Sequence, residues 1–152
     1  MWKDLVDRTD SLRESRLVAH LVDNPTEAFE GARTPMPHPS DIDRKHAPGD
    51  LIAPLPADSS QLAAVLAAAE GRDFVLIGPP GTGKSQTITN IIADQLGRGR
   101  TVLFVAEKSA ALDVVHRRLE RHGLGDAVLE LHSSKADRKS VLSQLGRSWD
   151  RA

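Results

Sequence analysis

DFVLIGPPGTGKSQTITN, residues 73–90, is the stretch around which the rest of the chain is organised. Residues 74–77 form a short, unbroken apolar run, as in a parallel strand that is buried on both faces. Residues 78–85 then fill every fixed position of the pattern GxxxxGK[ST], and we call them the glycine-rich loop. Isoleucine and leucine recur at helical spacing after the loop. The stretch therefore predicts a strand, a loop and a helix in succession.

The residue types of the glycine-rich loop suit the binding of an oligophosphate. Backbone N–H groups can surround a phosphate only where side chains do not intrude, and Gly81 and Gly83 permit that approach. A helix beginning near Lys84 would direct its free N–H groups and the positive end of its dipole at the anion. We expect Lys84 to reach the outer phosphates and the Ser85 hydroxyl to be a ligand of Mg²⁺. The predicted phosphate site comprises Gly78, Pro79, Pro80, Gly81, Thr82, Gly83, Lys84 and Ser85, with Lys84 and Ser85 as the candidate catalytic residues and Ser85 as the metal ligand.

Composition sets wider bounds. The 152 residues are 39% hydrophobic and 27% charged, which is ordinary for one soluble domain. Only 3% are aromatic, so contact with a nucleic acid would involve backbone phosphates more than stacked bases. The lack of cysteine excludes disulfides and thiol catalysis within the segment. The longest apolar run, residues 62–69, is too short to span a membrane, and the first four residues do not begin a signal peptide. These features predict a cytoplasmic protein with no membrane partner.

The pattern divides the chain into three parts. Residues 1–30 predict an amphipathic helical segment, with a helix to about residue 22 that can break at residues 9–11. Residues 31–57 are rich in proline, show no period and predict an irregular linker. Residues 58–152 predict an α/β domain. It would begin with a helix over residues 61–70 and continue with three strand–helix units whose strands are residues 74–77, 101–106 and 127–131. This order implies a parallel sheet flanked by helices, with right-handed crossovers.

A nucleotide hydrolase also needs an acidic residue at the end of a strand, where it holds Mg²⁺ or the metal-bound water. Glu107 and Glu130 are the two candidates, because each lies in or directly after a predicted strand. Each is a lone carboxylate, and Lys108 would compete for Glu107, so a metal role is not favoured for either. No NKxD sequence is present, which argues against a GTPase of the Ras type.

Three segments together resemble a known family. They are PLPADSSQLAAVL, FVLIGPPGTGKSQTITNIIADQL and TVLFVAEKSAALDVVHRRLERHGLGDAVLELHSSKADRKSVLSQL. They are similar to the start of the first RecA-like domain of superfamily 1 DNA/RNA helicases, and most of all to large bacterial ATP-dependent helicases of the AAA-domain type. The resemblance covers about residues 54–146. It implies a P-loop NTPase with a RecA-like parallel sheet, incomplete at the C-terminus, that binds ATP and Mg²⁺ through a Walker A loop. In its full-length form such a motor would couple ATP hydrolysis to movement on single-stranded DNA or RNA.

The resemblance also assigns roles outside the loop. Gln61 matches the Q-motif glutamine, whose amide can donate to and accept from the edge of adenine. Lys108 and Ser109 lie in residues 106–110, where the family has a strand-to-helix turn that touches the sugar-phosphate backbone. Residues 132–135, HSSK, resemble the next turn that faces nucleic acid, although capping of the last helix by a serine is an equal explanation.

Several parts of a complete motor lie beyond residue 152 in the family: the acidic Walker B motif, the arginine finger and the second motor domain. We therefore expect a truncated helicase that binds ATP, and the resemblance leaves open whether this chain is itself an enzyme. Two alternatives remain, a non-motor P-loop nucleotide-binding or interaction module and a small P-loop kinase. A kinase would need an arginine-bearing lid, but Arg117, Arg118 and Arg121 stand on a predicted helix without a glycine-rich lid.

Overall fold

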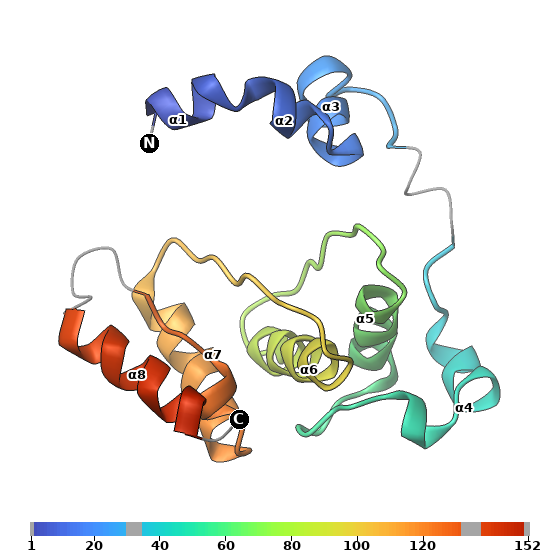
Figure 1. Cartoon of the computed structure of the whole chain (residues 1–152). Coiled ribbons are helices and arrows are strands. Elements are labelled where there is room, and N and C mark those ends of the chain that lie inside the picture. Colours follow the sequence, from blue (N-terminus) through green and yellow to red (C-terminus); the bar gives the residue numbers. More distant parts are fainter. Residues whose placement is uncertain (1, 30–34, 132–137, 151–152) are drawn as a thin grey trace. The chain divides into compact units, whose positions relative to one another are not determined.

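The computed structural model describes residues 2–29, 35–131 and 138–150, and the chain divides into two compact units, Met1–Pro35 and Met36–Ala152. Among the described residues, the first unit contains three short helices, α1 (Trp2–Asp7), α2 (Thr9–Arg13) and α3 (Arg16–Asp23) (Figure 1). Arg13 Nη2 lies 3.5 Å from Asp23 Oδ1 and links α2 to the end of α3. The helix predicted here is present in three pieces, but the interruptions fall at residue 8 and residues 14–15, and the predicted break at residues 9–11 is wrong because these residues lie in α2.

The second unit holds the glycine-rich loop. Its helical elements are η2 (Pro39–Asp41), α4 (Ile42–Lys45), η3 (Pro48–Asp50), α5 (Ser59–Ala69), α6 (Lys84–Gly97), α7 (Ser109–Arg121), η4 (Gly125–Ala127) and α8 (Arg138–Asp150). The four longer helices that the apolar pattern predicts after residue 58 are confirmed as α5 to α8. No helix in the described ranges is long and apolar enough to cross a membrane.

The predicted RecA-like parallel sheet is wrong for this structure. None of the described residues is in a β-strand, and the segments around residues 74–77, 101–106 and 127–131 run as plain connections between helices (Figure 1). A strand needs a neighbour that pairs its backbone N–H and C=O groups. Within the described ranges, no backbone hydrogen bond joins one of these segments to another. The apolar runs are present, but the pairing that would make them a sheet is not.

One face of these runs still packs on the helices. Val102 and Phe104 lie against the core, whereas Leu103 is 88% exposed and Val105 77% exposed. The side chains therefore alternate with the period of two that a strand would have. The opposite face, which the sequence marks as equally apolar, is open to solvent.

Two small apolar clusters hold the second unit together. In the first, Ile42 of α4 packs on Ala63 and Leu66 of α5. In the second, α7 packs on α6 through three buried side chains and the partly buried residues around them. The buried members of the second cluster are Ile92, Val115 and Leu119, and the partly buried ones are Ile88, Leu96, Val102, Phe104, Leu124 and Val128. Helix α6 is therefore the element that meets both α5 and α7.

Buried polar side chains of α6 fix the preceding linker. The fully buried Asn90 accepts from the N–H of Leu55 at 2.9 Å and donates to its C=O at 3.0 Å, so it pairs with both backbone groups of one residue. The buried carboxylate of Asp94 accepts from the N–H of Ile52 at 3.1 Å and from Arg98 Nε at 2.7 Å. The hydrogen bond to Asp94 raises the pKa of Arg98 above its ordinary value. These hydrogen bonds hold the linker against α6 at Ile52 and Leu55.

We predict that Asn90→Ala lowers the free energy of unfolding by about 2 kcal/mol, because both backbone groups of Leu55 lose their partner in a half-buried place. Urea unfolding followed by circular dichroism measures the change. Asn24→Ala, at an exposed asparagine, is the matched control and should shift stability by less than about 0.5 kcal/mol. Equal effects of the two substitutions would contradict a stabilising role of the hydrogen bonds between Asn90 and Leu55.

Candidate functional site

The glycine-rich loop meets α6 in a backbone conformation that requires glycine. Gly81 has φ +88° and Gly83, the N-cap of α6, has φ +78°. The N–H groups of Gln86 and Thr87 donate to the Gly83 carbonyl at 2.8 and 2.9 Å. No side chain caps this end of α6. The positive end of the helix dipole is therefore presented at the loop, where an anion can use it.

At two glycines of the loop, close neighbours leave no room for a side chain. A Cβ at Gly78 would lie 2.6 Å from Thr82 Oγ1, and one at Gly83 would lie 2.5 Å from Gln61 Nε2. Thr82 Oγ1 itself donates to the Pro79 carbonyl at 2.8 Å and tightens the turn. The loop is thus a tight backbone turn joined to a helix start, which is the arrangement that a phosphate site needs.

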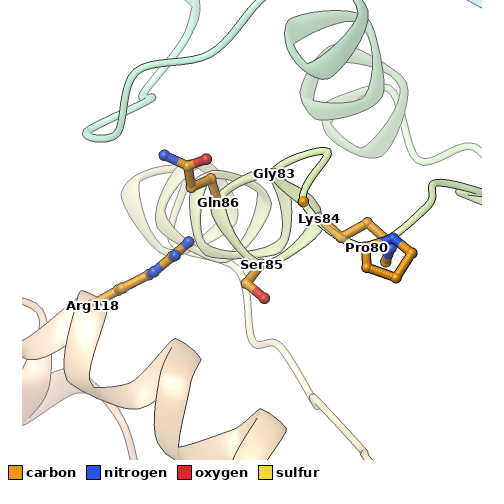
Figure 2. A pocket seen from close by; sticks show the side chains of 7 residues that line it. Pro80, Gly83, Lys84, Ser85, Gln86 and Arg118 are labelled. Carbon is orange, nitrogen blue, oxygen red and sulfur yellow. The ribbon is translucent and has the colours of Figure 1, made fainter.

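Lys84 is held on the loop. Its Nζ donates to the Pro79 carbonyl at 2.7 Å and also to the carbonyl of Gly78. Figure 2 shows Lys84 directed toward Pro80, while Ser85 leaves the first turn of α6 in another direction. The two predicted catalytic side chains therefore lie on different sides of the helix start.

Gln61 connects α5 to the loop. Its Oε1 accepts from the N–H of Asp58 at 3.2 Å, and the Asp58 carboxylate accepts from the N–H of Gln61 at 2.9 Å, which forms a capping box. Its Nε2 donates to the Thr82 carbonyl at 3.0 Å. The Ser60 hydroxyl and the Gln61 N–H lower the pKa of Asp58 below its ordinary value. The cap therefore persists as pH falls through the usual aspartate range and is lost only at lower pH.

An open cavity of about 520 Å³ lies at the loop. The residues that line it are Pro80, Gly81, Gly83, Lys84, Ser85, Gln86 and Arg118. Five of them were predicted as phosphate-site residues. Gly78, Pro79 and Thr82 contribute the internal hydrogen bonds of the loop and do not line this cavity.

Gln86 and Arg118 are the two lining residues that sequence reasoning did not assign to the site. Arg118 stands on α7, more than thirty residues after the loop, and reaches the cavity because α7 packs on α6. The sequence carries a weak signal for it, since Arg118 flanks the buried stripe made by Val115 and Leu119. That stripe predicts a packed helix face, but it does not say which element the face meets.

The predicted nucleic-acid residues are separate from this cavity. Lys108 is the N-cap of α7 and Ser109 its first residue, and both are exposed. Neither lines the cavity, and neither does the exposed Glu107. Residues 132–135, the other predicted turn, lie outside the described residues.

Glu130 also lies apart from the lining residues. Its Oε2 is 3.5 Å from His116 Nδ1 of α7, and its backbone N–H donates to Gln144 Oε1 of α8 at 3.0 Å. The described ranges contain no group of three histidine or carboxylate side chains that could hold a metal ion. Ser85 is consequently the one predicted metal ligand that the structure places at the cavity.

The chain is similar to known proteins. The AAA domain family matches residues 56–146. An uncharacterized ATP-dependent helicase of Mycoplasma genitalium is 55% identical over 47 residues, which are 31% of this chain and 4% of that protein. A homologue in Mycoplasma pneumoniae is 52% identical over 62 residues, or 41% of this chain and 6% of that protein.

A more distant relative is the alpha subunit of ATP synthase from Bordetella pertussis, which is 28% identical over 105 residues, 64% of this chain and 20% of the subunit. No solved structure matches the chain. The chain thus spans only a small part of the length of each of these relatives. Because the family match covers more than half of its residues, this chain belongs to the AAA domain family.

Proposed function

We propose that this chain is the ATP-binding part of a superfamily 1 DNA/RNA helicase. The observation that carries the proposal is the tight turn of residues 78–83 joined to the uncapped start of α6, with Lys84 at the junction. The ATP-dependent helicases that resemble the chain support the choice of nucleotide and of motor class. In such a motor, bound ATP supplies the bond whose hydrolysis drives movement.

The loop residues would share the work of holding ATP and Mg²⁺. The free N–H groups at the start of α6 would donate to phosphate oxygens. Lys84 would exchange its hydrogen bonds to the carbonyls of Gly78 and Pro79 for hydrogen bonds to the outer phosphates. Its ammonium group is already at the loop, so the side chain would have to move little. The Ser85 hydroxyl would be a ligand of Mg²⁺, which takes few protein ligands and keeps several waters.

Gln61 would read adenine without leaving its present partners. A carboxamide has two N–H donors and two acceptor lone pairs. One donor is used on the Thr82 carbonyl and one lone pair on the N–H of Asp58. The remaining donor and lone pair suit the N7 and N6 groups of adenine. This role would also couple recognition of the base to the position of the loop.

The exposed start of α7 would contact the nucleic acid. Lys108 offers a charge and Ser109 a hydroxyl, and both groups suit the sugar-phosphate backbone of single-stranded DNA or RNA. The corresponding cellular compartment would be the cytoplasm.

A second candidate function is a non-motor module that binds ATP without turnover. The lining of the cavity favours it, because none of the described residues that form this lining carries a carboxylate. Hydrolysis requires an acidic group to hold the metal and position water.

Replacing Lys84 with alanine should weaken ATP binding about 10- to 100-fold, because one charged hydrogen-bonding group at the outer phosphates is lost. Because AMP lacks those phosphates, its affinity should fall less than about threefold. Titration calorimetry with both nucleotides measures the difference. Lys3→Ala, at an exposed lysine of the first unit, is the control. An equal loss for ATP and AMP in a variant with unchanged circular dichroism would contradict the assignment.

Two variants of Gln61 test its roles. Gln61→Glu keeps the acceptor for the Asp58 N–H but has no N–H donor for the Thr82 carbonyl or for adenine, and Gln61→Ala removes the acceptor and both donors. If Gln61 reads adenine, the preference for ATP over GTP should fall about 5- to 100-fold in the alanine variant. A role restricted to the loop would weaken the binding of ATP and GTP equally. An unchanged ratio of the ATP and GTP affinities would therefore exclude adenine contact.

A steady-state ATPase assay with single-stranded DNA or RNA separates the motor from the module. For residues 1–152 we expect turnover well below about 1 s⁻¹, the low end of typical enzymes, because none of the described residues that line the cavity carries a carboxylate. Turnover at or above that rate that disappears in Lys84→Ala would contradict this expectation. It would also return Glu107 and Glu130 to consideration as the metal-site carboxylate.

A further inference from the structure

We propose that Arg118 of α7 is a second cationic contact to the outer phosphates of the nucleotide, a role that rests on the proposed binding of ATP at the glycine-rich loop. It would act opposite Lys84, from an element that the sequence pattern does not connect with the loop. The charge of the phosphate site would then depend on the packing of α7 against α6.

The position of Arg118 carries the proposal. Its side chain lines the same cavity as Gly83, Lys84 and Ser85. Figure 2 shows the guanidinium extending from α7 toward the first turn of α6, on the side of Ser85 and Gln86, whereas Lys84 is directed toward Pro80. Two cations therefore approach the start of α6 from different directions.

The electrostatics of the cavity favour an anion between them. Among the described residues of the lining, Lys84 and Arg118 are the charged ones, and both are positive. Two cations that face one cavity raise its affinity for a multiply charged anion. A guanidinium can also bind phosphate through two parallel N–H···O bonds, which an ammonium cannot do.

The hydrogen bonding of Arg118 points the same way. Its Nη1 is buried and has no hydrogen-bond partner among the described residues. Guanidinium N–H groups removed from water are normally paired, because leaving one unpaired is costly. A phosphate oxygen would satisfy this donor once the side chain turns it toward the cavity. Arg117, the adjacent residue, is exposed, and its Nε donates to the Asp113 carbonyl of its own helix at 3.1 Å.

The side of the helix start that Arg118 approaches indicates which phosphates it would contact. It approaches on the side of Ser85, the residue proposed as a ligand of the Mg²⁺ that would accompany the outer phosphates. Loss of Arg118 should therefore affect ATP and ADP more than AMP. A purely structural arginine would affect all three nucleotides alike.

The test compares Arg118→Gln with Arg117→Gln, which removes the same charge one residue away on the exposed side of α7. Affinities for ATP, ADP and AMP with Mg²⁺ are measured by calorimetry on the whole chain, with thermal unfolding as the folding control. Arg118→Gln should weaken the binding of ATP about tenfold or more and the binding of AMP less than about threefold. Arg117→Gln should leave the affinities for all three nucleotides nearly unchanged.

Arg118→Lys keeps the charge on a slightly shorter side chain but not the bidentate geometry, and it should give an intermediate loss of affinity for ATP. It serves as the test if the glutamine variant does not fold. Equal losses for ATP and AMP, or equal effects at Arg117 and Arg118, would overturn the role of Arg118. If ATP binding depends on Lys84 but not on Arg118, only this inference fails. If the wild-type chain shows no Lys84-dependent binding of ATP, the proposed function fails as well.

Discussion

The position of α6 is the constraint on which the rest of the second unit depends. Its first turn continues the glycine-rich loop, and its apolar stripe receives α7 through Ile92. Its buried polar side chains, Asn90 and Asp94, fix the linker that leads into α5. Gln61 of α5 then returns to the loop through the Thr82 carbonyl. One helix therefore holds together the glycine-rich loop and both of the elements that surround it.

The same packing decides what kind of site the loop can be. A glycine-rich turn at a helix start offers backbone donors and one lysine, which suffice for a phosphate but give little selectivity. Selectivity has to come from neighbouring elements. In this structure α5 contributes an amide to the loop, and α7 contributes a guanidinium to the cavity. The proposed discrimination of base and of phosphate number thus arises from helix packing around a common loop.

The absence of a sheet from the described residues has a physical reason that the sequence does not reveal. The runs at residues 74–77 and 101–106 have the composition of buried strands. Yet Val75 is 84% exposed and Ile77 90% exposed. A strand exists only where another strand satisfies its backbone groups, and that partner can be distant in the chain. Local composition can therefore mark a potential strand, but it cannot supply its neighbour.

The sequence by itself determined the local elements: the glycine-rich loop, the helix that begins at Lys84, the capped helix after Asp58, and the amphipathic stripe of α7. These follow from glycine conformation, capping and apolar period, which act over a few residues. Only the tertiary structure decided that Gln61 reaches the loop, that Arg118 lines the cavity with Lys84, and that Lys108 does not. Those placements depend on which helix faces meet in space, and the apolar pattern of a single helix does not specify its partner.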